Sequence, residues 1–189
     1  MVRADATASR AAIIDAAWQG FATYGPDISL RSIAQDAGVG IATLYRHFPT
    51  RDDLFIGVGE EMLARLTSVC NRYVDAPSWD EDPAGTWSDF IADDYGLQIG
   101  TLAAKMAESI NVSPELHGRI KALRKEAFSQ VEPILDRAKN AGLVRPEITT
   151  ARLQMGIGLL SRPLPEMVEK LEPGVSNWLL DTFARGIAP

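Results

Sequence analysis

Apolar residues recur along most of this chain at the three- and four-residue spacing of an amphipathic helix. A long stripe within residues 114–140 consists of Leu116, Ile120, Leu123, Ala127, Val131, Leu135 and Ala138. A second run predicts one helix from about Arg51 to Tyr73. The sequence shows neither the alternation of half-buried strands nor an internal repeat. We therefore expect an all-α fold of about nine helices.

Prolines indicate where several of these helices begin or bend. A helix is expected to begin near Pro83, because proline is tolerated in the first turn, and residues 76–83 before it are expected to form a loop. Pro133 is expected to kink or restart the long helix, because proline lacks the backbone N–H that a helix interior needs. The remaining expected helices are a short one with Leu102, Met106 and Ile110, and two final ones over about residues 149–161 and 175–187.

A short helix and a glycine turn are predicted at residues 29–38. The apolar residues at the spacing of one buried helix face are Leu30, Ile33, Ala34 and Ala37. Ser29 is a suitable N-cap for this helix. Gly38 is expected to end it, because glycine readily adopts the left-handed conformation that closes a helix.

A second short helix is predicted directly after this turn, from Ile41 to Phe48, and Pro49 ends it. Leu44 and Phe48 lie four residues apart and are expected to point inward. The outward faces are expected to carry Gly40, Ile41, Thr43, Tyr45 and His47. Two short helices joined by a sharp turn form a helix-turn-helix, whose second helix has the right size for the major groove of DNA.

Three stretches in and beside this motif match a known signature. They are IAQDAGV at residues 33–39, TLYRHF at 43–48 and RDDL at 51–54, and the segment 11–25 matches the helix that precedes the signature. Together they resemble the tetracycline-repressor (TetR) family of bacterial transcription regulators. The resemblance covers roughly residues 10–60. The fit of the preceding helix makes it more specific than a helix-turn-helix pattern alone.

The resemblance implies a DNA-binding domain of three helices in residues 1–55 and a helical effector-binding and dimerisation domain in residues 56–189. It implies a sequence-specific transcriptional regulator, a homodimeric repressor that binds a palindromic double-stranded DNA operator and is released by a small molecule. Two alternatives stay open at this point. One is a DNA-binding protein of the same fold without a small-molecule inducer, and the other is a helical protein-interaction module.

Hydroxyl groups and cations at fixed positions make most protein–DNA hydrogen bonds. By resemblance, Tyr45 and His47 contact phosphate, Thr43 contacts phosphate or a base edge, and Arg51 anchors the DNA backbone. Arg31 corresponds to a position that can reach guanine, which suits a guanidinium group. The full predicted set is Ser29, Arg31, Gly40, Ile41, Thr43, Tyr45, His47 and Arg51. Seen without the motif, Tyr45 could be a half-buried aromatic, and Arg46 is expected to form a surface ion pair.

The last two helices are apolar on more than one side, because Met155 and Leu159 lie off the stripe of the first, and Trp178 and Leu180 off that of the second. A helix that is apolar around much of its circumference must be buried on several sides, which favours a homodimer. By resemblance, the dimer forms through these two helices. The predicted interface residues are Leu153, Ile157, Leu160, Val175, Leu179 and Phe183.

Aromatic and methionine side chains of the middle helices could line an effector pocket. The predicted pocket residues are Trp79, Trp87, Phe90, Tyr95, Met106, Phe128 and Met155. The alternative for each of them is an ordinary place in the core. A lining of this kind with few nearby cations favours an apolar or aromatic effector, neutral or cationic, over a multiply charged anion.

The chain is acidic, with 19 Lys and Arg against 25 Asp and Glu and a net charge of −6. Proteins that bind nucleic acid without sequence preference are usually basic. Even residues 1–55 carry only five cations against six carboxylates. We therefore expect binding that is specific for a site and has a modest dependence on salt.

The sequence offers little for catalysis. Its two histidines are His47 and His117, and His117 is expected on the exposed side of the long helix. Neither a phosphate-binding loop, a dinucleotide fingerprint nor a Cys-x-x-Cys pair occurs. The adjacent carboxylates Asp93 and Asp94 are expected on a solvated helix face rather than in an acid–base pair. We expect no enzymatic activity, no cofactor and no metal site.

A single cysteine, Cys70, permits no internal disulfide and fits a reducing compartment. The N-terminus lacks the apolar core of a signal peptide, and no apolar run approaches the length of a membrane span. We therefore expect a cytoplasmic protein without a membrane partner.

Overall fold

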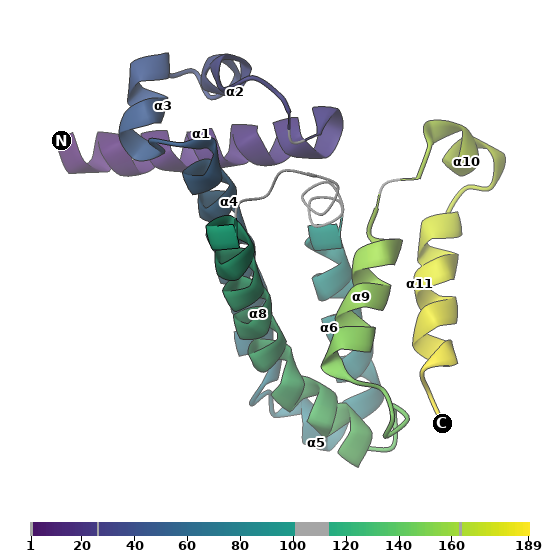
Figure 1. Ribbon diagram of the computed structural model, residues 1–189. Coiled ribbons are helices and arrows are strands. Elements are labelled where there is room, and N and C mark those ends of the chain that lie inside the picture. Colours follow the sequence, from purple (N-terminus) through teal and green to yellow (C-terminus); the bar gives the residue numbers. More distant parts are fainter. Residues whose placement is uncertain (1, 26, 101–113, 163) are drawn as a thin grey trace. The chain divides into compact units, whose positions relative to one another are not determined.

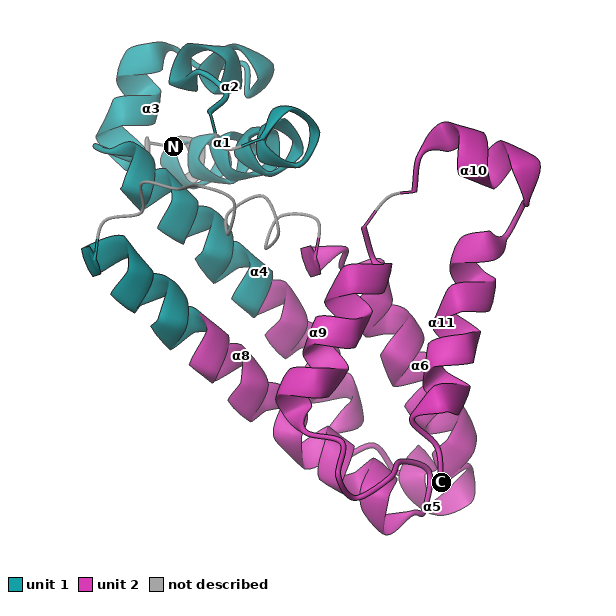
Figure 2. Cartoon of the chain, turned by 45° about the vertical axis from the view of Figure 1, so that its right-hand side comes forward, with its two compact units in different colours: residues 1–63, 102–123 teal, residues 64–101, 124–189 magenta. Residues whose placement is uncertain are grey.

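The computed structural model describes residues 2–25, 27–100, 114–162 and 164–189, which form ten helices (Figure 1). This part of the chain contains no strand, so the expected all-α fold is confirmed. The short helix expected around Leu102, Met106 and Ile110 lies outside the described residues. Packing divides the chain into two compact units (Figure 2). Unit 1 comprises residues 1–63 and 102–123, and unit 2 comprises residues 64–101 and 124–189.

Unit 1 contains α1 (Val2–Tyr24), α2 (Leu30–Asp36), α3 (Ile41–His47), the first part of α4 (Arg51–Tyr73) and the start of α8 (Pro114–Asn140). Its core is apolar, as the stripes predict, and includes the fully buried side chains of Ile13, Phe21, Ile33, Leu44 and Leu54. The rings of Phe21 and Phe55 stack with their centroids 4.4 Å apart. This core fixes α2 and α3 against α1 and α4.

Unit 2 contains the rest of α4 and α8, together with five further helices. These are α5 (Ser78–Glu81), α6 (Pro83–Gly96), α9 (Thr150–Leu160), α10 (Glu166–Leu171) and α11 (Val175–Gly186). Helix α9 packs between α6 and α11 (Figure 1). A large apolar cluster holds the unit together and includes Trp87, Phe90, Val131, Leu135 and Leu153.

The structure differs from the expected helices in three places. Residues 76–83 are not all loop, because Ser78–Glu81 form the single turn of α5. Helix α10 was not predicted, since six residues are too few to show helical periodicity. Helix α8 runs without interruption through Pro133, so the chain does not restart there. Pro133 has no N–H to donate, so the backbone carbonyl one turn earlier in the helix lacks its usual hydrogen bond. Because Pro133 is exposed, water can bind this carbonyl instead.

The other predicted helices agree with the structure to within a few residues at their ends, apart from α1, which begins earlier than the signature indicated. His117 is exposed on α8, as expected. Among the described residues, none of the helices combines the length and the apolar character that crossing a bilayer requires.

Candidate DNA-binding site

A hydrogen-bonded glycine turn joins α2 to α3. Gly38 has a φ of +67°, the left-handed conformation that glycine adopts without strain. Its N–H donates to the carbonyl of Gln35 at 3.0 Å, and the N–H of Val39 donates to the carbonyl of Ala34 at 2.9 Å. These two bonds are the pair that defines a Schellman motif, so the end of α2 has a standard geometry. The predicted sharp turn is confirmed.

The start of each short helix is also defined by its sequence. The hydroxyl of Ser29 accepts a hydrogen bond from the N–H of Ser32 at 3.0 Å, so Ser29 is the N-cap of α2. Gly40 is the N-cap of α3, in an extended conformation and without a side chain that could cap the helix. Because Gly40 is exposed, the entry to α3 is open to an approaching partner.

Helix α3 has an apolar inner face and a polar outer face. Leu44 and Phe48 are buried, as the four-residue spacing predicted. On the outer side, Tyr45 is 49% exposed, and Ile41, Thr43 and His47 are partly exposed. Arg31 is exposed on α2. Unit 1 therefore carries a short helix that packs by one side and offers hydroxyl and imidazole groups on the other.

Arg46 differs from its expected role. Its Nη2 donates a hydrogen bond to the hydroxyl oxygen of Thr43 at 2.8 Å, one helical turn back, where a surface ion pair was expected. The spacing of three residues makes this contact local to α3. The bond orients the Thr43 hydroxyl, which is itself a predicted DNA contact.

Arg51 makes a contact within the unit that the sequence did not reveal. Its Nη2 donates to the backbone carbonyl of Ile28 at 2.7 Å, and the contact is partly buried. Ile28 precedes α2, so this bond ties the first turn of α4 to the entry of the helix-turn-helix. Arg51 therefore holds the motif together, whichever further contacts its guanidinium makes.

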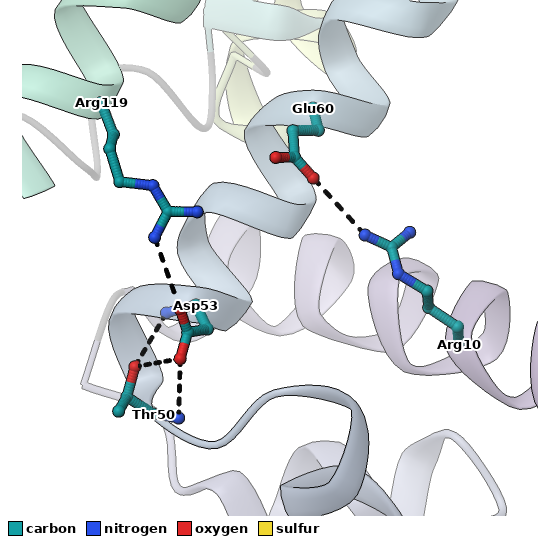
Figure 3. Close-up of polar contacts among 5 residues, drawn as sticks. All are labelled: Arg10, Thr50, Asp53, Glu60 and Arg119. Atoms are coloured by element: carbon teal, nitrogen blue, oxygen red, sulfur yellow. Dashed lines mark hydrogen bonds and ion pairs between the residues drawn. The ribbon is translucent and has the colours of Figure 1, made fainter.

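The first turn of α4 is closed by a reciprocal cap (Figure 3). The Asp53 N–H donates to the Thr50 hydroxyl oxygen at 3.0 Å, and the Asp53 carboxylate accepts from the Thr50 N–H at 3.2 Å and from the Thr50 hydroxyl at 2.7 Å. This is the arrangement of a capping box. The hydrogen bond from the Thr50 hydroxyl, followed by smaller effects that include Arg119, lowers the pKa of Asp53. Asp53 is therefore an anion at neutral pH.

Residues 13–58 match the model of the family described as bacterial regulatory proteins, tetR family. This range covers the end of α1, both helices of the motif and the capped start of α4. This segment belongs to the tetR family. The match supports a role of this chain in DNA-binding transcriptional regulation.

Solved structures of transcriptional regulators resemble this chain over most or all of its length. A TetR transcription regulatory protein from Mycobacterium vanbaalenii is 25% identical, with 100% of both chains covered and a TM-score of 0.60. A TetR transcriptional regulator from Streptomyces coelicolor is 25% identical, with 95% and 98% covered and a TM-score of 0.58. FadR from Bacillus subtilis, solved in complex with stearoyl-CoA, is 21% identical, with 93% and 98% covered and a TM-score of 0.63. A search of the curated proteins finds no significant match.

Four of the residues predicted for an effector pocket lie in or against one apolar cluster of unit 2. Trp79, Trp87 and Phe90 are buried in the core cluster of unit 2, and Tyr95 packs against that cluster. The Trp87 and Phe90 rings stack at 5.6 Å, and the indole N–H of Trp79 donates to the Tyr73 carbonyl at 2.7 Å. These contacts are those of core residues.

The other predicted pocket residues are placed differently. Phe128 is partly exposed on α8, Met155 is 58% exposed on α9, and Met106 lies outside the described residues. An open hollow of about 420 Å³ lies between α4 and α6, with Arg65, Arg72 and Asp93 in its lining. None of the predicted pocket residues is among those that line it.

The residues predicted for a dimer interface fall into two groups. Leu153 and Ile157 are buried in the core of unit 2, which leaves them no surface to offer a partner chain. The partly exposed members are Leu160, Val175, Leu179 and Phe183. The largest exposed apolar side chains of α9 and α11 are instead those that lie off the two stripes: Met155 at 58%, Leu159 at 59% and Trp178 at 59%.

Asp94 corrects the expectation of a solvated carboxylate pair. Asp93 does lie near the surface, where it accepts hydrogen bonds from Arg72 at 2.6 Å and from the Tyr73 hydroxyl at 2.5 Å. Asp94, by contrast, is buried on α6. Neighbouring helix positions point about 100° apart, so one residue of such a pair can face inward while the other faces solvent. The sequence did contain a signal for the burial of Asp94. This residue continues the apolar stripe of Phe90 and Ile91 at the helical spacing.

Proposed function

We propose that this tetR-family regulator is a homodimeric repressor that binds a palindromic operator through α3, in the cytoplasm of a bacterium. The observation that carries the proposal is the polar outer face of α3 on a well-capped helix-turn-helix, inside the segment that matches the family model. A helix of this kind fits the major groove, and two copies on a two-fold axis would contact half-sites about one DNA turn apart.

The proposed division of work within the motif follows from the chemistry of each side chain. The exposed hydroxyl of Tyr45 and the imidazole of His47 bind phosphate groups, which fixes the position of α3 on the duplex. Arg31 and Thr43 contact base edges, and Ile41 contacts a thymine methyl group. The N-cap residues Ser29 and Gly40 leave room for the backbone to approach DNA, and Arg51 supports the start of α4 beside it.

A second copy of the chain is the proposed partner of α9 and α11. Met155, Leu159 and Trp178 expose large apolar side chains on these helices, and a two-fold related pair would remove them from water. The proposed interface includes the partly exposed Leu160, Val175, Leu179 and Phe183. A stable homodimer requires large exposed apolar side chains of this type at its interface. The apolar stripe of α9 cannot serve, because the chain already buries it in its own core.

We propose a small effector with an apolar or aromatic part as the signal that releases DNA. The stearoyl-CoA complex of FadR, which shares the fold at 21% identity, supports a ligand-responsive body without identifying the ligand. The test measures the shift in melting temperature that stearoyl-CoA, stearate and coenzyme A each produce. The three ligands separate binding of the acyl chain from binding of the nucleotide part. Tight binding of coenzyme A alone would contradict an effector that is recognised by its apolar part.

The test of the DNA-binding site uses fluorescence anisotropy with an operator obtained by selection. Arg31→Ala and Tyr45→Ala should each weaken operator binding by about tenfold or more, because a good contact contributes about 1–3 kcal/mol. Tyr24→Ala is the matched control, since Tyr24 is 73% exposed at the end of α1, away from α3 in the sequence. Unchanged affinity of both site variants, with intact folding, would contradict the proposed interface and favour a protein-interaction module.

A further inference from the structure

The start of α8 belongs to the same compact unit as the helix-turn-helix, although it lies far away in the sequence. The Nη1 atom of Arg119 lies 3.4 Å from Oδ1 of Asp53, which is 66 residues earlier in the chain (Figure 3). One turn further along α8, Leu123 packs so closely against Gly59 that a Cβ on that glycine would lie 2.9 Å from the leucine Cδ1. Two contacts, one polar and one apolar, thus hold α8 against the first part of α4.

The Asp53 carboxylate lies at a position where its negative charge affects the proposed DNA contact. It accepts hydrogen bonds at the N-terminus of α4, where the helix dipole attracts anions. In the proposed complex, this helix end lies beside the DNA backbone, because Arg51 and the end of α3 adjoin it. A carboxylate there repels phosphate groups unless a cation neutralises it. Asp52 adds a second negative charge next to it in the sequence.

We propose that Arg119 is a positioning residue for operator binding, which acts by pairing with Asp53 and so neutralising the carboxylate at the start of α4. The inference rests on the proposed DNA-binding function of α3 and α4. It assigns part of the operator affinity to a residue outside the segment that matches the family model, residues 13–58.

Arg119 acts through Asp53 rather than through DNA itself. Both side chains of the pair are partly exposed, at 47% for Arg119 and 37% for Asp53, so salt screens their interaction and the effect is moderate. A lone carboxylate within about 8 Å of several phosphates raises the free energy of the complex enough to weaken binding by about three- to tenfold. The same pairing makes operator affinity depend on where the start of α8 lies.

The experiment measures the operator Kd of the full-length protein at about 0.1 M salt, where screening is incomplete. The variants are Arg119→Gln, Arg119→Lys, Asp53→Asn and the double variant Arg119→Gln/Asp53→Asn. Lys121→Gln is the matched control, because it removes one positive charge from an exposed position two residues along the same helix. Thermal unfolding of each variant separates an effect on binding from a loss of folding.

We expect Arg119→Gln to weaken binding by about three- to tenfold, while Arg119→Lys and Lys121→Gln stay within about twofold of the wild type. Asp53→Asn should bind at least as tightly as the wild type, because asparagine keeps an oxygen for the cap without the charge. The decisive result is the double variant, which should recover the affinity that Arg119→Gln loses.

Two results would overturn the inference while leaving the proposed function intact. One is an unchanged Kd for Arg119→Gln when the wild type binds its operator. The other is a loss that Asp53→Asn does not rescue, together with a salt slope reduced by about 0.9, which indicates a direct phosphate contact by Arg119. Failure of the wild type to bind any DNA would contradict the proposed function, and the inference with it.

Discussion

Gln154 of α9 donates a hydrogen bond from Nε2 to Oδ2 of Asp94 on α6 at 2.5 Å. The two helices thereby meet through a polar contact beside the apolar cluster of unit 2. Burial raises the pKa of Asp94 to about 6, and the hydrogen bond from Gln154 offsets only part of this effect. The fold therefore makes Asp94 easier to protonate than it is in the unfolded chain, although a pKa of about 6 leaves most of the group ionised at pH 7.

This pKa predicts how the stability of the protein depends on pH. Because the folded pKa of about 6 exceeds the ordinary value of 3.8, the stabilising contribution of protonated Asp94 is complete below about pH 4 and is lost as pH rises through about 6. Asp94→Asn should remove this term and raise the free energy of unfolding at pH 7.5 by roughly 2 kcal/mol. Urea unfolding of wild type and variant at pH 5 and 7.5 measures the difference.

Asp89→Asn is the control for this prediction, because Asp89 is an exposed carboxylate on the same helix. The comparison between variants matters, because Asp53 and Asp93 have lowered pKa values and oppose Asp94 as the pH falls. An Asp94→Asn protein that is less stable than the wild type at pH 7.5 would show that the charged form is needed in the core.

The turn of the helix-turn-helix gives a prediction about stability with a built-in control. Gly38→Ala should lower the free energy of unfolding by about 1 kcal/mol, because alanine is strained at positive φ. Gly40→Ala should have little effect on stability, since Gly40 has a φ of −70° and nothing within 4 Å of an added Cβ. Equal destabilisation by both substitutions, measured by denaturant unfolding, would argue against the left-handed turn.

Dimerisation provides a prediction about the last helices. Leu159→Glu and Trp178→Glu should each shift the protein toward monomer, because a buried carboxylate is strongly unfavourable in an apolar interface. Sedimentation equilibrium at micromolar concentration reports the association state. Tyr24→Glu serves as the control, because it changes an even more exposed aromatic residue in unit 1. A wild-type protein that sediments as a monomer would refute the proposed interface.

The charge distribution predicts a modest dependence of operator binding on salt. The chain has a net charge of −6, and two of the three cations in the motif, Arg46 and Arg51, already donate hydrogen bonds within the unit. A plot of log K against log salt concentration should therefore have a slope well below about 9 in magnitude, the value for ten phosphate contacts. A slope that steep would mean that many more cations reach the DNA than the motif supplies.

Sequence patterns predicted the local structure of the motif because its determinants are local. Ser29, Gly38 and the four-residue spacing of Leu44 and Phe48 act within one or two helical turns, so their positions in the sequence define the helix ends and the buried face. The family resemblance rests on the same residues. Helices α5 and α10 escaped prediction because a helix of one or two turns shows too few repeats of its spacing.

Contacts between distant segments could not be predicted in this way. The spacing of Leu153 and Ile157 identifies an apolar face of α9, but whether α6 or a second chain covers that face depends on how the helices pack. The same limit applies to Asp94, whose burial depends on α9, and to Arg119, whose partner lies 66 residues away. Tertiary packing decides these positions, and a helical period does not encode it.

The most direct test of the central claim is selection of genomic fragments on the purified protein at near-physiological salt, run in parallel with the Tyr45→Ala variant. The account predicts that the wild type enriches a short inverted repeat and that the variant does not, because α3 makes the contacts that recognise DNA. Enrichment of the same fragments by both proteins, or of none by a correctly folded wild-type dimer, would contradict it.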